Sequence, residues 1–185
     1  MTAITHAVTD EERQEVHALF DRTFKDIAPD GVPMANRNAM YAPIIPTIRN
    51  GSGDLIAAAM SCRAQVAAAW TMLRPGVTRG HNDYGAVLER HSELDLIAVE
   101  PSARGTGLGS QLVVHIEQIL AQRGVRVWFG CATKDLEVPR LEEFYTRLGF
   151  KIVPGSQPLP EFLGKRWTLP LAEQPAFYFY KRPTA

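Results

Sequence analysis

A strand, a glycine cluster and a helix follow one another in the middle of the chain, and this order constrains the fold more than any other feature. Residues 93–99 have the period of two expected of a half-buried strand, with Glu93 and Asp95 on one face, and Pro101 follows shortly after the segment. Apolar side chains recur at helical spacing over residues 108–120. Gly105 and Gly107 lie between these two segments, and Gly109 stands at the start of the second. The block predicts a strand that turns sharply into a helix, as in the first half of a βαβ crossover.

The segments on either side predict a mixed α/β or α+β domain. Thr9 and Glu12 have the spacing of a capping box, so a helix is expected to begin after Thr9. Pro43 and Pro46 interrupt residues 34–50, which predicts one short helix or two broken turns there. The other expected elements are a hairpin of residues 55–61 and 65–73, a surface loop over 74–91, a strand over 125–131, a helix over 139–148, a strand from 150 to 153, an irregular connection over 154–175 and a last strand over 176–181.

Length and charge limit what the chain can be. Its 185 residues suffice for one domain, over residues 1–185, with a sizeable core. Twenty basic and twenty acidic side chains balance, so the net charge gives no reason to expect nucleic acid or an anionic membrane as a partner. No apolar stretch is long enough to span a membrane, and the first residues lack the pattern of a signal peptide. We therefore expect a cytoplasmic protein.

The two cysteines, Cys62 and Cys131, both stand within apolar runs. We therefore expect two buried free thiols in a reducing compartment. A single disulfide between them is the less favoured alternative. No group of His and Cys residues has the spacing of metal ligands, so no metal site is expected.

The glycine cluster has the chemistry of an anion site. Backbone N–H groups at the start of a helix lack intrahelical partners, and the helix dipole adds positive potential there. Glycine lets a phosphate approach the backbone, and Arg104 adds a fixed positive charge. A P-loop would need a lysine that is absent, and a dinucleotide-binding loop would need glycine where Ser110 stands. A tight turn without a ligand is the alternative, although one glycine would suffice for that.

The remaining pattern, R-x-x-G-x-G from Arg104 to Gly109, resembles the pyrophosphate loop of the GNAT superfamily of acyl-CoA-dependent acetyltransferases. LIAVEPSARGTGLGSQL at residues 96–112 is similar to the strand, proline, loop and helix of that family. LEEFYTRLGFKIV at residues 141–153 resembles a later helix, and FYFYK at residues 177–181 resembles the last strand. The resemblance covers roughly the C-terminal half of the chain. It implies a GNAT-like fold with a central, mixed, mostly antiparallel sheet of about six or seven strands flanked by helices.

The resemblance also implies acetyl-CoA as the co-substrate, with its pyrophosphate held by the loop amides. The residues that it implies for cofactor binding are Ile97, Ala98, Val99, Arg104, Gly105, Thr106, Gly107, Leu108, Gly109 and Ser110. The strand before the loop would splay from its neighbour to admit the pantetheine arm, and a backbone N–H near Ala98 or Val99 would face the thioester oxygen. A small-molecule or peptide amine is the implied acceptor, and a homodimer is expected on the same grounds.

For the reaction itself, the resemblance points to Tyr145 as the general acid that protonates the leaving thiolate. Helical spacing places Tyr145 at the border of a core stripe, so a packing role is the alternative. Glu93 occupies the position of a glutamate that some family members carry, and it is the candidate general base. Asp95 or an ordered water are the alternatives for the base. Glu93 could also stand at a frayed strand end, with Asp95 paired to an arginine of a neighbouring strand.

Other side chains are weaker candidates. His81 and His91 lie in or beside the predicted surface loop and are expected to be solvated, whereas His115 lies on the polar face of the helix and is expected to be inert. The residues that lie where the family builds an acceptor lid are Asn36, Arg37 and Tyr41. The leading hypothesis is therefore an N-acetyltransferase. A non-catalytic acyl-CoA-binding module and a dinucleotide oxidoreductase are the alternatives, and Ser110 disfavours the second.

Overall fold

The structure is a computed structural model that describes residues 3–24, 27–63, 89–134, 137–157, 159–160 and 174–184. The strands in these ranges form one seven-stranded sheet in the order β1-β2-β3-β4-β5-β7-β6. The pairs β1–β2, β2–β3, β5–β7 and β6–β7 are antiparallel and the pair β4–β5 is parallel, which confirms the expected mixed, mostly antiparallel sheet of an α/β or α+β protein. The chain divides into two compact units, Met1–Cys62 with Leu94–Ile119 and Arg63–Glu93 with Leu120–Ala185.

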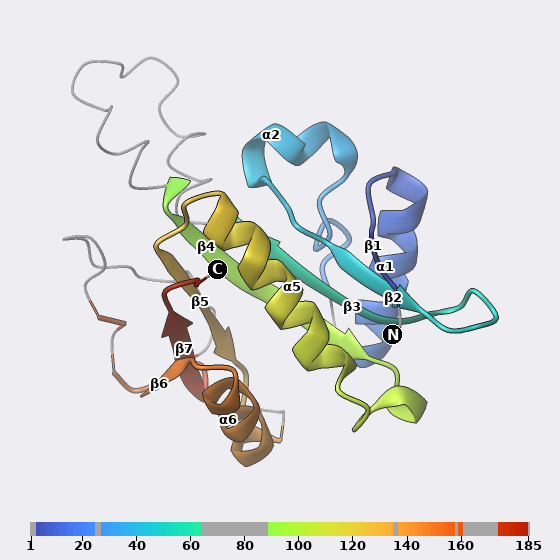
Figure 1. The fold of residues 1–185 in the computed structure, drawn as a ribbon. Coiled ribbons are helices and arrows are strands. Elements are labelled where there is room, and N and C mark those ends of the chain that lie inside the picture. The colour runs from blue at the N-terminus through green and yellow to red at the C-terminus, as the bar shows by residue number, and fades with distance from the viewer. Residues whose placement is uncertain are drawn as a thin grey trace, which may run out of the picture. The chain divides into compact units, whose positions relative to one another are not determined.

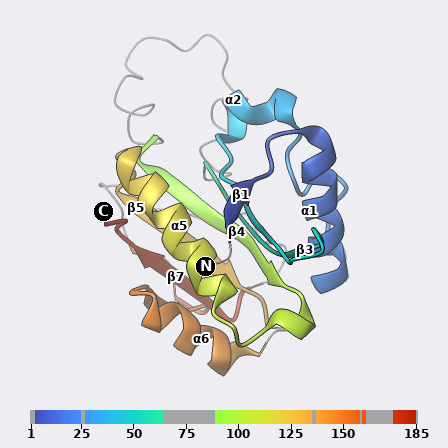
Figure 2. The ribbon, with the colours of Figure 1, turned by 45° about the vertical axis from the view of Figure 1, so that its right-hand side comes forward.

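The first unit holds the N-terminal elements and the strand–loop–helix block. Its elements are β1 (Ile4–His6), α1 (Asp10–Thr23), the 3-10 helix η1 (Ala35–Arg37), α2 (Asn38–Tyr41), β2 (Pro46–Arg49), β3 (Leu55–Cys62), η2 (Pro101–Ala103) and most of β4 (His91–Val99) and of α5 (Leu108–Gln122). β2 pairs antiparallel with β1 on one side and with β3 on the other. Figures 1 and 2 show α1 and α5 on opposite faces of these strands.

Small side chains on β3 allow both faces of this unit to be covered. Ala57 and Ala59 point to one face, Ala58 and Met60 point to the other, and all four are buried. Ala58 and Met60 belong to a cluster with residues of α1 and β4, which are Val16, Leu19, Phe20 and Ala98. A strand buried on both faces has no polar side to alternate with, which is why this stretch reads as a continuous apolar run.

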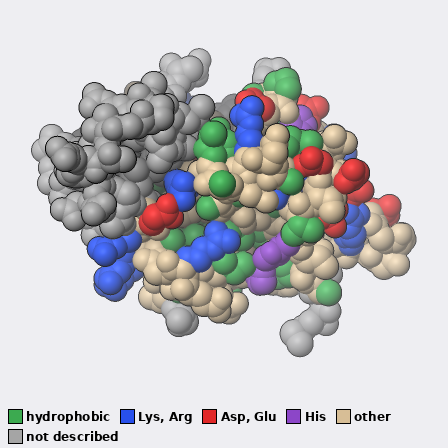
Figure 3. All heavy atoms as spheres, turned by 90° about the horizontal axis from the view of Figure 1, so that it is seen from above, with side chains coloured by type: hydrophobic (Ala, Val, Ile, Leu, Met, Phe, Trp, Pro, Cys, Tyr) green, Lys and Arg blue, Asp and Glu red, His purple; other side chains and the backbone are tan. Residues whose placement is uncertain are grey.

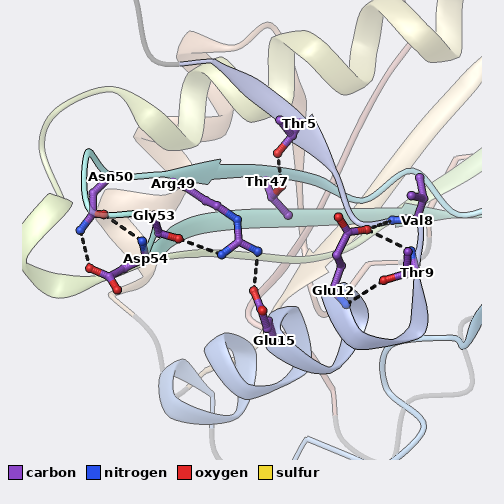
Figure 4. Close-up of polar contacts among 10 residues, drawn as sticks. All are labelled: Thr5, Val8, Thr9, Glu12, Glu15, Thr47, Arg49, Asn50, Gly53 and Asp54. Carbon is purple, nitrogen blue, oxygen red and sulfur yellow. Dashed lines mark hydrogen bonds and ion pairs between the residues drawn. The ribbon is translucent and has the colours of Figure 1, made fainter.

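Helix α1 begins at the capping box that the sequence predicts. The Thr9 hydroxyl accepts from the Glu12 amide at 3.3 Å, and the Glu12 carboxylate accepts from the amides of Thr9 and Val8 at 3.0 and 2.7 Å (Figure 4). Figure 4 also shows an ion pair between Arg49 of β2 and Glu15 of α1. These contacts fix where α1 starts and tie its exposed side to the sheet.

The segment from residue 34 to residue 50 differs from the expectation of a short helix or broken turns. Residues 35–41 are helical as expected, but Pro46–Arg49 is a strand with a partner on each side. The prolines do prevent a continuous helix. Pro46, however, stands at the first position of the strand, where a missing N–H is tolerated, and Ile48 is fully buried.

The second unit is built around a three-stranded antiparallel group and a short helix. Its elements are β5 (Val127–Ala132), α6 (Val138–Arg147), β6 (Lys151–Pro154), β7 (Phe177–Lys181), the first residues of β4 and the last of α5. β7 lies between β5 and β6, and His91–Glu93 of β4 pair parallel with Val127–Phe129 of β5. The predicted elements of this half are confirmed to within a few residues. The expected strand over 65–73 and most of the predicted loop and connection lie outside the described residues.

The described surface is mixed in character. Val8 and Val114 are the large hydrophobic side chains exposed in the described ranges, and on the face drawn in Figure 3 hydrophobic side chains are dispersed among polar and charged ones. Cys62 and Cys131 carry thiols rather than a disulfide, as expected; the first is buried and the second half-buried. Among the described helices, none is both long and apolar enough to cross a membrane. The described side chains also form no group of three or more potential metal ligands.

Candidate active site

The loop between β4 and α5 is held in shape by its own residues. The Arg104 guanidinium donates through Nε to the Val99 carbonyl at 3.0 Å, and the Thr106 hydroxyl donates to the Ala103 carbonyl at 2.6 Å. The Ala103 amide in turn donates to the Glu100 carbonyl at 2.9 Å. The loop leads directly into α5 (Figure 1). It is therefore ordered by internal contacts, without needing a ligand to shape it.

Two of the loop glycines have a backbone that other residues rarely adopt. Gly105 has φ +81° and Gly107 has φ +85°, both in the left-handed region. A Cβ added at either position would meet nothing within 4 Å. The space around these glycines is open, so they leave the backbone accessible to a ligand in addition to permitting the turn.

The start of α5 presents unpaired backbone donors next to this open space. The Gln111 amide makes a hydrogen bond to the Gly107 carbonyl at 3.0 Å. The amides of Leu108, Gly109 and Ser110 precede that bond and have no acceptor within the helix. Arg104 is exposed and carries a positive charge in the same loop. Backbone donors, the helix dipole and a guanidinium thus belong to one short loop, as the sequence predicts for an anion site.

The strand residues before the loop alternate as the sequence predicts. Ala98 is buried in the cluster with α1, and Leu96 packs against that cluster. Asp95, Ile97 and Val99 occupy the alternate positions of β4 and are half-buried. The three residues implied in thioester contact, Ile97 to Val99, therefore run without interruption into the loop.

Glu93 lies inside the strand and not at a frayed end. β4 begins at His91, two residues earlier, and Glu93 is paired with Phe129 of β5. Its side chain is buried, with an exposed fraction of 8%. The expectation of a solvated His91 is wrong, because this first residue of β4 is buried with an exposed fraction of 2%. His81 lies outside the described residues.

Tyr145 is the buried residue of α6, and not a residue at the border of the core stripe. Its ring stacks on Phe179 with a centroid distance of 3.8 Å and an interplanar angle of 13°. Phe150 and Phe177 meet the same ring edge-on at 5.6 and 6.2 Å. Burial, and to a smaller extent the nearby Cys131 thiol, raise the pKa of Tyr145 above its ordinary value of 10.0. The phenol is therefore protonated at neutral pH and able to donate a proton.

The end of α6 is anchored by a residue that the sequence analysis missed. Lys181, the last residue of β7, donates through Nζ to the Leu148 carbonyl at 2.7 Å, just beyond the helix. The same ammonium lies 4.8 Å from the Phe150 ring centroid and 5.8 Å from the Trp128 ring. A lysine at the end of an aromatic strand gives no local signal of this contact, because its partner is distant in the sequence.

The remaining candidates that the structure describes lie in the first unit. His115 is not isolated, because its Nε2 lies 2.8 Å from Nε2 of His6 on β1. Asn36 and Arg37 are exposed and Tyr41 is half-buried, all within η1 and α2. The structure brings the loop and Ile97–Val99 together in the first unit, and it places Tyr145 and Glu93 in the second.

Comparison with known proteins finds a family match over part of the chain. Residues 65–152 match the sequence model described as the Acetyltransferase (GNAT) domain. No curated protein sequence matches the chain. An acetyltransferase of the GNAT family from Staphylococcus aureus Mu50 has a similar structure, with a TM-score of 0.63 and 12% identity over 98% of this chain and 100% of that one.

Two similar structures have more specific names. The ribosomal-protein-alanine N-acetyltransferase from Escherichia coli aligns with a TM-score of 0.61 and 16% identity, over 100% of this chain and 96% of its own. An aminoglycoside 6'-N-acetyltransferase complexed with coenzyme A aligns with a TM-score of 0.61 and 15% identity, over 99% of this chain and 98% of its own. At these identities the likeness establishes the fold. The domain match and the shared fold show that this chain has a GNAT-like fold and support an acetyltransferase, and the loop at the start of α5 lies within the matched residues.

Proposed function

We propose that the chain transfers an acetyl group from acetyl-CoA to a primary amine. The loop from Arg104 to Ser110 is the observation that carries this proposal. Gly105 and Gly107 keep its backbone open, and it joins the first amides of α5 to a stretch that carries the Arg104 charge. A pyrophosphate bound there would receive backbone hydrogen bonds and the favourable end of the helix dipole. Ile97, Ala98 and Val99 then extend from the loop along the path expected for the thioester.

In the proposed reaction the amine nitrogen attacks the thioester carbonyl carbon, and the carbon–sulfur bond breaks. The amine gives up its proton to Glu93 or to an ordered water, and the thiolate receives a proton from the Tyr145 hydroxyl. A buried phenol with a raised pKa suits the second transfer, because it remains protonated until the thiolate forms. Glu93 is buried, so it would accept the amine proton away from bulk solvent.

The acceptor is best sought among two classes of amine. One of the similar structures is named for an aminoglycoside and another for the alanine of a ribosomal protein, so both small polyamines and peptide N-termini belong in the first panel. The panel should be assayed by release of the CoA thiol. Binding of CoA is measured in parallel by calorimetry at low salt. If millimolar CoA gave neither heat nor thermal stabilisation, the proposal would be refuted.

Tyr145→Phe tests the role of the phenol without removing the aromatic ring. The ring can keep its stack on Phe179, so CoA affinity should change little while kcat falls about 100-fold, the usual range for loss of a general acid. Tyr178→Phe is the matched control, because it removes a phenol from β7 of the same unit and should leave kcat unchanged. Equal kcat values for Tyr145→Phe and the parent would assign Tyr145 to packing alone.

The pH profile provides a second readout of Tyr145. Because the pKa of Tyr145 lies above 10.0, its acidic form persists through neutral and mildly alkaline pH. With saturating substrates, kcat should therefore not fall between neutral pH and a pH of about 10. A decline below that pH that is present in the parent and absent in Tyr145→Phe would show that the phenol ionises too early to act as proposed.

A further inference from the structure

An ion pair joins α1 to the residue at which the loop begins. Arg22, in the last turn of α1, donates through Nη2 to Oε1 of Glu100 at 2.8 Å. The Arg22 side chain is 57% exposed and the Glu100 side chain 26% exposed. Glu100 directly follows β4, its amide donates to the Ile56 carbonyl at 2.9 Å, and its carbonyl accepts from the Ala103 amide. Its backbone is thus part of the turn that shapes the loop.

The carboxylate of Glu100 is unfavourable for an anion site. It stands four residues before Arg104, a chain distance of about 14 Å at most. A free negative charge there would repel bound phosphates. It would also offer Arg104 a competing partner, and the Arg104 guanidinium already lies alongside the strand end through its bond to Val99.

We propose that Arg22 is a positioning residue for cofactor binding, which holds and neutralises Glu100 so that Arg104 and the loop amides remain available to the pyrophosphate. This inference rests on the proposed binding of acetyl-CoA at the loop. Arg22 does not touch the loop glycines, and it acts through Glu100. An exposed pair of this type stabilises a fold little, so the main effect of removing it falls on the ligand.

The size of the effect follows from Coulomb's law. One unit charge about 10 Å from another, at an effective dielectric constant between those of a protein surface and of water, changes an equilibrium constant about two- to tenfold. In Arg22→Ala we therefore expect the Kd of CoA and the KM of acetyl-CoA to rise about two- to tenfold at low salt. The value of kcat should stay the same, because Arg22 takes no part in bond making.

The experiment measures CoA affinity by calorimetry in five proteins at low and high salt. These are the parent, Arg22→Ala, Arg22→Lys, the double variant Arg22→Ala with Glu100→Gln, and Arg49→Ala. Arg22→Lys keeps the charge and should bind CoA like the parent. The double variant removes the unpaired carboxylate and should also recover parent affinity. The affinity ratio between parent and Arg22→Ala should shrink towards one at about 1 M salt, where the Debye length is only about 3 Å.

Arg49→Ala is the matched control. Arg49 pairs with Glu15 of α1 and with the Gly53 carbonyl, so the variant removes the same charge and another ion pair between α1 and the sheet, without touching the loop. It should leave CoA affinity unchanged. A weakening as large as that in Arg22→Ala would show an effect of net charge only and would overturn the inference.

Two further results would overturn it as well. The first is parent-like CoA affinity in folded Arg22→Ala, as judged by its thermal midpoint. The second is a loss that persists in the double variant and at high salt, which would mark a purely structural role. If Arg22→Ala folds poorly, the CoA affinity of the single variant Glu100→Gln tests the inference instead. Weaker CoA binding in Glu100→Gln than in the parent would contradict the proposed repulsion between the Glu100 carboxylate and the phosphates. Failure of the parent to bind CoA would instead refute the proposed function, so the two failures are distinguishable.

Discussion

Replacing Gly107 with alanine separates the two reasons for which glycine stands in the loop. One reason is the backbone, since φ is +85°, and the other is the open space into which a Cβ would project. Gly124, after α5, provides a matched site. Its φ is +73°, a Cβ there would also meet nothing within 4 Å, and it lies outside the loop. Gly124→Ala therefore imposes a similar backbone penalty without approaching the proposed ligand.

The stability cost should be alike in both variants. A left-handed conformation costs an L-residue about 1–2 kcal/mol, and alanine recovers part of this by restricting the unfolded chain, which leaves a loss of about 1 kcal/mol. For a chain of this size that corresponds to a fall in Tm of roughly 2–4 °C. Differential scanning calorimetry of the two variants and the parent checks this value.

The effect on CoA should differ between the two variants. Phosphate oxygens must come within about 3 Å of the loop amides, and a methyl group on Gly107 would stand in that approach. Loss of one hydrogen bond to a charged group, worth about 1.5–3 kcal/mol, predicts roughly 10- to 100-fold weaker CoA binding in Gly107→Ala. Gly124→Ala should bind like the parent.

Calorimetric titration with CoA at low salt decides between the two reasons. If Gly107→Ala and Gly124→Ala lost the same stability and bound CoA equally well, the open space at Gly107 would serve only the turn. The argument that the backbone is left bare for a phosphate would then be refuted, although binding elsewhere on the loop could persist.

Two further substitutions test contacts that shape the units. Hydrogen bonds from the amides of Thr9 and Val8 lower the pKa of Glu12 below its ordinary value of 4.5. The stability that the Glu12 charge contributes is therefore complete above pH 4.5, and it is lost as the pH falls through the lower pKa of the folded state. Urea unfolding should show Glu12→Gln less stable than the parent at neutral pH, with the gap closing below pH 4.5; a gap independent of pH contradicts this. Lys181→Met removes the hydrogen bond to the Leu148 carbonyl. The free energy of unfolding should fall by about 1–2 kcal/mol, which lowers Tm by a few degrees. The value of kcat should fall as well, because α6 carries the proposed acid. Lys181→Arg should recover much of both, and an unchanged Tm in Lys181→Met would exclude the anchoring role.

Features that depend on a few neighbouring residues could be predicted from the sequence. The capping box at Thr9 was predicted because its two partners lie three residues apart. The loop was predicted because Gly105 and Gly107 supply a backbone that few other residues can adopt. The strand β2 was not predicted, because the prolines announce only that a helix stops, while the pairing of residues 46–49 depends on strands elsewhere in the chain.

The sequence by itself determined most of the helices and strands, the glycine-rich turn before α5 and the resemblance to the GNAT superfamily, because each rests on local backbone preference and side-chain type. Only the tertiary structure decided that Tyr145 is buried on Phe179, that His91 is inside the sheet and that Arg22 pairs with Glu100. Each of these depends on a partner brought close by folding. Burial and charge pairing are properties of that three-dimensional neighbourhood, so no periodicity within a single segment could have revealed them.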